Sequence, residues 1–267
     1  MKVAVVHSFY DRAQASGENE VVLAQIEQLR SRGETVELIA QYTDVEKASR
    51  LYPLRAVRGA ANLGGQSPEA KLEAFQPDVV HVHNIFPNWD TKWLATWGRR
   101  TVVTLHNYRP LCSNALMWRD GHDCNECLVR GTRAAVEHAC YRDSRLATAP
   151  LAFASRDRGA HQPVLQQTAR IITLNSGAAQ LFQGLTSTPV VVIPNFTAGQ
   201  EQVPGSQGTS GRWLFVGRLT PEKGVARLIS QLQEGVGLDV VGDGPDRAAV
   251  ESAASASRAD IRLLGKR

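Results

Sequence analysis

The chain has 267 residues, of which 43% are hydrophobic and 21% are charged. This composition is typical of a globular protein and excludes a disordered or fibrous chain. The length corresponds to about one or two domains. No apolar run reaches the roughly 18–20 residues that a membrane-spanning helix needs. The start, MKVAVVHS, is interrupted too early for a signal peptide and is typical of a buried first strand. We therefore expect a soluble, cytoplasmic protein.

The formal net charge is +4, from 30 Lys and Arg against 26 Asp and Glu. The densest basic stretch runs from Arg130 to Arg170 and also contains acidic residues. Clustered cations attract anionic partners, but a solvated surface with a mild basic bias explains this stretch better. No basic run alternates with aromatic residues, so we expect no binding to nucleic acid.

Short apolar runs alternate with helical stretches along the first part of the chain. A helix is predicted over Glu18–Arg32, where apolar residues recur at helical spacing and Gly33 is placed to end it. A polar loop from Ser8 to Gly17 precedes this helix. The predicted strands are Lys2–Val6, Val36–Ile39, Val79–Val82, Thr101–Leu105, Ile171–Leu174 and Val190–Ile193. This alternation predicts parallel βαβ units with helices on both faces of a sheet.

A polar stretch, TAGQEQVPGSQGTSG at residues 197–211, has no apolar periodicity and is typical of a linker. Beyond it, strands are predicted at Trp213–Val216, Leu238–Val241 and Ile261–Leu264, with helices near Val225–Leu232 and Asp246–Ala256. We expect an α/β fold of two Rossmann-like domains, 1–195 and 211–267, with a linker at 196–210. The second has about three strands where such domains usually have about five or six, so we expect it to be incomplete, with an open sheet edge.

The segment FVGRLTPEKG, residues 215–224, places two cations after a buried strand. Arg218 leaves the carboxyl end of the strand, and Lys223 lies near the start of a helix that we expect to begin near Pro221. Open α/β sheets bind ligands at this edge, and cations with free helix N–H groups suit a diphosphate. Two surface cations in an ordinary loop are the alternative.

Two turns that contain glycine follow other strands. In VGDGP, residues 241–245, Gly242 and Gly244 would allow a ligand to approach closely, and a tight turn is the alternative. Arg247 occupies the last position of the G-x-G-x-x-G fingerprint, which argues against a nicotinamide dinucleotide. In ASGENE, residues 15–20, Gly17 lies at the start of a helix whose N–H groups could meet a phosphate. A plain N-cap by Ser16 is the alternative there.

Three histidines lie near the ends of predicted strands. His81 and His83, in DVVHVHN, share one face of their strand because side chains alternate along a strand. His106 ends an apolar strand at the ligand-binding edge, where it can donate a hydrogen bond or act as acid or base. A buried structural histidine is the alternative. We expect a structural role for His81 and a functional role for His106.

All the cysteines fall within one loop, predicted at about 110–145 beside His106, with the spacing C-x11-C-x2-C-x12-C. In a cytosolic chain this pattern favours a metal over disulfides. Four thiolates make a closed structural zinc site, which we favour over an iron–sulfur cluster. His122 or His138 could replace one ligand. Free thiols or a redox pair are the alternatives. The candidate ligands are Cys112, Cys124, Cys127 and Cys140.

The chain resembles the retaining glycosyltransferases of family four, which have the GT-B fold. The matching segments are the Gly17 loop, DVVHVHN, VVTLHNYRPLC, VVVIPNF, LFVGRLTPEKGV, VVGDGP and LLGKR. The cysteine-bearing loop is similar to that of a subset of bacterial members. The resemblance implies a cytoplasmic enzyme of polysaccharide biosynthesis that moves a hexose from a nucleotide-sugar donor with retention of configuration. It implies no catalytic metal, a glycan, lipid-linked or small-molecule acceptor, and peripheral membrane association as one option.

The resemblance also implies roles for individual residues. Arg218 and Lys223 would bind the donor diphosphate, with Gly17 close to the same phosphates across the cleft. His106 would lie against the transferred sugar, and the acceptor would bind mainly to the N-terminal domain. Fixed cations aimed at a leaving diphosphate stabilise the transition state more than the ground state. In such enzymes the leaving phosphate is thought to take the proton of the acceptor.

The end of the chain carries the last part of the resemblance. The GDGP turn and the backbone at Gly265 and Lys266 would lie towards the nucleotide base. The family's paired glutamates, E-x7-E, lie beyond the last predicted strand, and this sequence stops before them at Arg267. Asn107 also stands where Asp is frequent after the histidine. The alternative is a non-catalytic nucleotide- or glycan-binding remnant, with a partner chain or self-association covering the open sheet edge.

Overall fold

The structure is a computed structural model that describes residues 1–10, 16–196 and 211–267. The chain divides into two compact units, Met1–Met117 with Cys124–Gly199, and Trp118–Asp123 with Gln200–Arg267. The predicted linker beyond Phe196, and Ala15 of the first polar loop, lie outside the described residues. No helix within the described ranges is both long enough and apolar enough to cross a membrane.

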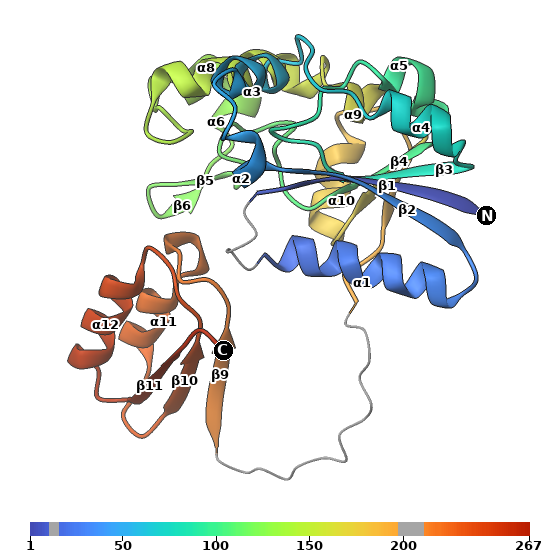
Figure 1. The fold of residues 1–267 in the computed structure, drawn as a ribbon. Helices are drawn as coiled ribbons and strands as arrows, with labels where there is room; N and C mark the ends of the chain where they lie inside the picture. Colours follow the sequence, from blue (N-terminus) through green and yellow to red (C-terminus); the bar gives the residue numbers. More distant parts are fainter. Residues whose placement is uncertain (11–15, 197–210) are drawn as a thin grey trace. The chain divides into compact units, whose positions relative to one another are not determined.

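The first unit contains a six-stranded parallel sheet in the order β2-β1-β3-β4-β7-β8 (Figure 1). Its strands are β1 Lys2–Phe9, β2 Thr35–Tyr42, β3 Val79–Asn84, β4 Thr101–Leu105, β7 Arg170–Thr173 and β8 Val190–Val192. These strands confirm all six predicted ones. β1 continues beyond Val6 because Ser8 pairs with Gln41 of β2 and its hydroxyl accepts a hydrogen bond from buried Asn88.

Helices cover both faces of this sheet, with α1 on one face and α4 and α5 on the other in Figure 1. α1 (Gly17–Ser31) buries Val22 and Ile26 against Val3 and Val5 of β1. The segment between β2 and β3 holds helices that the sequence did not predict. The other helices of this unit are α2 Thr43–Glu46, α3 Tyr52–Ala60, α4 Glu69–Phe75, α5 Leu94–Trp97, α6 Glu126–Val129, α7 Arg133–Glu137, α8 Arg145–Ala154, α9 Pro163–Gln166 and α10 Ser176–Gln183, with 3-10 turns at Gly98–Arg100 and Asp157–Gly159.

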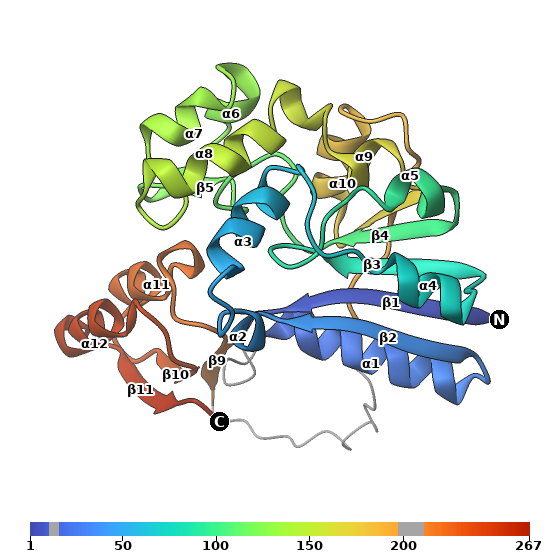
Figure 2. The same ribbon diagram turned by 45° about the horizontal axis from the view of Figure 1, so that its top comes forward.

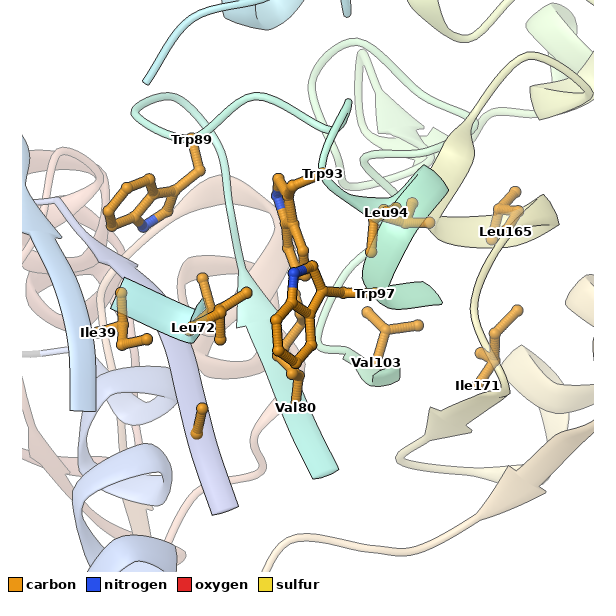
Figure 3. Close-up of a cluster of buried hydrophobic side chains, with 14 of the residues drawn as sticks. Ile39, Leu72, Val80, Trp89, Trp93, Leu94, Trp97, Val103, Leu165 and Ile171 are labelled. Carbon is orange, nitrogen blue, oxygen red and sulfur yellow. The ribbon is translucent and has the colours of Figure 1, made fainter. Parts of the chain in front are cut away.

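Three tryptophans between β3 and β4 pack into the larger core on the face opposite α1. Trp89, Trp93 and Trp97 are buried and belong to one cluster with Leu72 of α4 (Figure 3). Each ring of this size removes a large apolar area from water, worth a few kcal/mol. The Trp89 indole N–H also donates to the carbonyl oxygen of His7 at 3.1 Å. This packing fixes the carboxyl end of β1, where candidate site residues lie.

The second unit contains a three-stranded parallel sheet in the order β11-β10-β9. Its elements are β9 Arg212–Val216, a 3-10 turn at Pro221–Lys223, α11 Val225–Gln231, β10 Gly237–Val241, α12 Arg247–Ala256 and β11 Asp260–Gly265. The three predicted strands are confirmed. A 3-10 turn begins at Pro221, where a helix start was predicted, but it ends at Lys223, and α11 begins only at Val225 after Gly224.

Both helices of the second unit lie on the same side of its sheet (Figure 2). They bury Ile229 and Val250 against Leu238 and Val240 of β10. Side chains of β9 that point the other way, such as Val216, are exposed. A partner chain or self-association over this sheet stays a prediction.

Candidate functional site

The carboxyl edge of the six-stranded sheet brings together four histidines. His7 comes from β1, His81 and His83 from β3, and His106 directly follows β4. Nδ1 of His83 lies 2.9 Å from Nε2 of His106. Nε2 of His81 lies 2.8 Å from the hydroxyl of Thr104, so His81 has the buried, hydrogen-bonded environment expected of a structural histidine. The strand register therefore joins His83 and His106 into one pair.

This histidine cluster is uncharged at neutral pH. Burial lowers the pKa of His7, His81 and His106 to about 4 in each case. Burial, followed by the neighbouring histidines, lowers the pKa of His83 further still. A neutral imidazole can donate and accept a hydrogen bond but carries no charge. Because His83 occupies one ring nitrogen of His106, the other nitrogen is left to meet a ligand.

A cavity of about 720 Å³, counting its open mouth, lies beside His106. Apolar residues form much of its wall, and His83, Asn62, Gln162 and Arg109 add polar groups. Apolar walls with a few converging polar groups are typical of small-molecule sites. The cavity lies wholly within the first unit, so this unit carries a candidate ligand site of its own.

Arg109 is held firmly at the edge of this cavity. Its guanidinium lies 4.6 Å from the ring centre of Phe86 and 5.4 Å from that of Tyr141. Its backbone N–H donates to the side-chain oxygen of Asn107 at 3.0 Å, and its guanidinium donates to the carbonyl oxygen of Ser113. Aromatic rings stabilise a cation placed over their faces. The turn after His106 therefore presents a positioned positive charge to the cavity.

Several buried polar atoms at this edge lack a hydrogen-bond partner among the described residues. They include His7 Nδ1, Glu18 Oε1, His83 Nε2, Asn84 Nδ2 and Arg109 Nε. Buried polar atoms are rarely left unpaired, so such a cluster favours a ligand or ordered water. Burial raises the pKa of Glu18 to about 7, although the charge of Arg109 opposes the shift. The sequence indicated Glu18 only as the first residue of a predicted helix, and Arg109 only as part of the VVTLHNYRPLC segment.

The N-terminus of α1 lies near the same edge. Gly17 is its first residue, and a methyl group added to Gly17 would meet no atom within 4 Å among the described residues. Ser16 occupies the N-cap position, as the alternative expects, but its side chain makes no capping hydrogen bond. The first N–H groups of α1 are thus not occupied by this serine. A phosphate at Gly17 stays a prediction.

In the second unit, Arg218 and Lys223 lie where the sequence predicts them. Arg218 follows β9 after Gly217, and Lys223 ends the 3-10 turn before α11. Both side chains are exposed. The turn between them is shaped by the Thr220 hydroxyl, which donates to the Glu222 carboxylate at 2.6 Å. The two cations therefore belong to one loop at the carboxyl end of a parallel strand.

The glycines of the GDGP turn have a structural reason to be glycine. A Cβ on Gly242, whose φ is +148°, would lie 1.8 Å from the carbonyl oxygen of Gly217. A Cβ on Gly244 would lie 2.2 Å from the carbonyl oxygen of Leu219. The loops after β9 and β10 thus pack backbone to backbone. The tight-turn alternative accounts for both glycines, and their contact with a nucleotide stays a prediction.

The loop after β11 also packs against the loop after β10. The N–H of Gly242 donates to the carbonyl oxygen of Gly265 at 2.9 Å, and exposed Lys266 follows. All the predicted donor residues of this unit therefore lie in the three loops at the carboxyl ends of β9, β10 and β11. Among them, Arg218, Lys223 and Lys266 supply positive charge.

The predicted metal ligands Cys112, Cys124, Cys127 and Cys140 lie between β4 and α8, in a segment that also contains the hairpin β5 (Trp118–Arg119) and β6 (His122–Asp123). All four are half-buried, and none of them forms a disulfide within the described residues. Within the described ranges, no three His, Cys, Asp or Glu side chains already lie where together they could hold a metal ion. Nε2 of His138 lies 3.1 Å from the Glu126 carboxylate. The metal therefore stays a prediction.

Comparison with protein families decides the identity of the chain. The model of Glycosyltransferase Family 4 matches residues 15–197, more than half of the sequence. The chain belongs to glycosyltransferase family 4. The Gly17 loop, the histidine pair and the cysteine-bearing loop all fall inside the matched range. A search of curated proteins found no match.

Solved structures show the fold that this family 4 chain shares. WaaG, a glycosyltransferase involved in lipopolysaccharide biosynthesis, is similar with a TM-score of 0.51 at 13% identity, over 99% of this chain and 70% of WaaG. The apo form of the lipopolysaccharide outer core galactosyltransferase WaaB has a TM-score of 0.49 at 12% identity, and the match covers 100% of this chain and 68% of WaaB. HepE of Anabaena, in complex with UDP and glucose, has a TM-score of 0.44 at 15% identity, and the match covers 100% of this chain and 70% of HepE. The architecture is GT-B-like, with Rossmann-like parallel sheets.

Proposed function

We propose that this family 4 glycosyltransferase moves a hexose from a nucleotide-sugar donor to a glycan, lipid-linked or small-molecule acceptor with retention of configuration. One observation carries the proposal: a cavity lined by neutral His106 lies where open α/β sheets bind ligands. The polar atoms beside it that lack partners support occupation by a ligand rich in hydroxyl groups. We further propose that this reaction belongs to polysaccharide biosynthesis in the bacterial cytoplasm, with peripheral membrane association where the acceptor is lipid-linked.

The donor diphosphate is assigned to the charged loops of the second unit. Arg218 and Lys223 bind its oxygens, and the backbone at Gly242, Gly244 and Gly265 faces the nucleotide. Negative charge grows on the diphosphate as the glycosidic bond breaks, so fixed cations are worth more in the transition state. The leaving phosphate then takes the proton of the acceptor, and no side-chain base or catalytic metal is required.

The transferred sugar is assigned to the first unit. The ring nitrogen of His106 that does not face His83 bonds a sugar hydroxyl, and Gly17 offers N–H groups of α1 to the phosphates. Arg109 lines the same cavity and binds polar groups of the acceptor, and Glu18 lies within electrostatic reach of Arg109. Two observations support this division of roles: the neutral histidines lie in the first unit, and the exposed cations Arg218 and Lys223 lie in the second.

A donor screen tests the proposal. The full chain is incubated with UDP-, GDP- and ADP-hexoses and with a panel of acceptors, and NMR reads the anomeric configuration of each product. His106→Ala should lower kcat/KM roughly 100-fold, as loss of one oriented hydrogen-bonding group does, with little change in nucleotide affinity. His161→Ala, which removes an exposed histidine beside Asp157 in the same unit, is the matched control and should keep full activity.

Two outcomes would contradict the proposal. A product of inverted configuration would exclude retention. Nucleotide binding without turnover for any donor would favour the alternative of a catalytically incomplete binding protein that needs a partner chain.

A further inference from the structure

Helices α3 and α8 of the first unit contact one another and lie side by side in Figures 1 and 2. Both helices line the cavity beside His106, with Gly59 and Ala60 from α3 and Leu151 from α8. A Cβ on Gly59 would lie 3.2 Å from the carbonyl oxygen of Pro87, so this side of α3 packs closely against the loop after β3. The opposite sides of the two helices therefore face away from the cavity.

The outer side of α3 is apolar. Leu51, which precedes the helix, Leu54 and Val57 are 59%, 61% and 51% exposed. Their spacing of three residues places them on one side of the helix, because successive residues turn by about 100°. None of the residues of α3, all of which the structure describes, is buried. Single exposed leucines are ordinary on a protein surface, but a continuous apolar stripe indicates an interaction site.

The outer side of α8 carries a second apolar stripe. Leu146, Ala149 and Phe153 are exposed and recur at spacings of three and four residues. By the same helical geometry they lie on the side of α8 opposite Leu151, which lines the cavity. Two neighbouring helices thus leave apolar stripes without a partner among the described residues. The outer apolar face is defined as Leu51, Leu54, Val57, Leu146, Ala149 and Phe153.

Positive charge surrounds this outer apolar face. Residues 47–68 contain no acidic side chain and four basic ones, Lys47, Arg50, Arg55 and Arg58. The Arg58 guanidinium and the Lys92 ammonium group both lie within 4 Å of the position that a Cβ on Gly64 would occupy. Arg55 lies 3.5 Å from the carboxylate of Glu46, which offsets part of this charge. The α3 side of the face therefore keeps a positive balance.

The stripe on α8 also lies among arginines. Arg145 directly precedes Leu146, and the Arg156 guanidinium lies 4.1 Å from the ring centre of Phe153. Residues 144–156 contain no acidic side chain, although Asp143 and Asp157 flank them. Both helices of the outer apolar face thus combine exposed apolar side chains with cations.

An anionic lipid surface matches this combination. Acyl chains accept apolar side chains, while arginine side chains extend along the apolar surface and keep their charged ends among lipid phosphates. A second copy of the chain would instead bring the same cations against one another, and like charges across an interface are unfavourable. Charge complementarity therefore favours anionic lipid over self-association as the occupant of this face.

We propose that the outer apolar face of α3 and α8 docks the protein on a membrane that contains anionic phospholipid. With nine and ten residues, the two helices are too short to cross a bilayer and lie along its surface. The inference deepens the proposed function and rests on it for its purpose, because docking would bring the cavity close to a lipid-linked acceptor.

Vesicle sedimentation tests this surface without any donor or acceptor. The full chain should bind vesicles of phosphatidylcholine and phosphatidylglycerol in equal parts roughly 10-fold more tightly than phosphatidylcholine alone, and added salt should weaken the binding. Leu51→Glu combined with Leu54→Glu should lower the affinity roughly 100-fold, because apolar contact is lost and negative charge is added. Leu23→Glu, at an exposed leucine of α1, is the matched control and should bind as the unmutated chain does.

A second pair of variants tests the cations. Arg50→Ala combined with Arg58→Ala should weaken binding roughly 30-fold, about fivefold for each cation near an anionic surface. Arg32→Ala, which removes an exposed cation at the end of α1, should leave the affinity unchanged. Circular dichroism shows whether each variant is folded, and the lipid and salt dependence of the unmutated chain needs no variant at all.

Three outcomes would overturn the docking surface. They are equal binding to neutral and anionic vesicles, unchanged binding by the folded leucine variant, and a dimer in sedimentation velocity that this variant abolishes while vesicles do not bind. The last outcome would assign the face to a second copy of the chain. Vesicle binding without sugar transfer would leave the docking surface and remove the proposed function, whereas transfer without vesicle binding would remove only the surface.

Discussion

The carboxyl edges of the two sheets differ in how they use charge. At the first, His7 and His83 are buried, His106 is partly buried, and all three are neutral. At the second, Arg218 and Lys223 are exposed on loops whose backbones pack together. A buried neutral group fixes direction, whereas an exposed cation attracts a negative charge without needing one geometry. The difference suits a sugar at the first edge and a diphosphate at the second.

The strongest test of this comparison removes both cations. Arg218→Ala combined with Lys223→Ala should weaken nucleoside diphosphate binding by roughly 10³-fold, because each charge-assisted hydrogen bond is worth about 1.5–3 kcal/mol. Isothermal titration calorimetry gives the affinity. Urea unfolding of the double variant shows whether its three-stranded sheet is still folded.

Arg227→Ala is the matched control for this pair, since Arg227 is an exposed cation of α11 in the same unit. It should leave the affinity as it is. Unchanged affinity in the double variant would show that the donor does not bind at these loops, and the contrast between the two edges would then lose its functional meaning.

Backbone packing in the second unit gives the next largest effect. Gly242→Ala should destabilise the three-stranded sheet by about 3 kcal/mol, because the new Cβ would overlap the carbonyl oxygen of Gly217. Urea unfolding measures the loss. Gly235→Ala, at φ +84° but with nothing within 4 Å of the new Cβ, should cost only about 1 kcal/mol. Equal costs would mean that the loops can separate freely.

The sequence predicts the strands of both units because each is a short apolar run, and it predicts Arg218 because strand, loop and cation are adjacent in the chain. It could not predict the pair of His83 and His106, which depends on how β3 and β4 pair. Glu18 and Arg109 were missed because the fold, and not their spacing in the sequence, brings them to this edge of the sheet. Short helices such as α2 carry too few residues for a periodic signal.

Acidification should destabilise the first unit more than the second. The folded pKa of His7, His81 and His106 is about 4, below the usual value of 6.5, so the unfolded chain binds more protons between these values. Stability of the first unit is therefore fully present above pH 6.5 and falls by about 1.4 kcal/mol per pH unit for each buried histidine as pH drops towards 4. Residues 200–267 contain no histidine, and His122 of the second unit is exposed.

Hydrogen exchange at pH 7, 6 and 5 resolves the units, and protection should fall first in the six-stranded sheet. Glu18 acts in the opposite sense, because its pKa in the folded protein is raised from 4.5 to about 7. The stability that its protonated form contributes is lost as pH rises from 4.5 towards 7. Glu18→Gln should therefore steepen the loss on acidification. A loss that is equal in both units would contradict the buried, neutral state of the histidines.

The smallest expected effect concerns the N-terminus of α1, the one place in the first unit where a phosphate is predicted. Ser16→Ala should change the free energy of unfolding by less than about 0.5 kcal/mol, since this serine makes no capping hydrogen bond. Asn175→Ala is the contrast, because the Asn175 side chain accepts from the N–H of Ala178 at 2.8 Å and its loss should cost about 1 kcal/mol. A similar cost at Ser16 would mean that the serine caps α1 in solution. Its N–H groups would then be occupied, and the predicted phosphate contact at Gly17 would have to be abandoned.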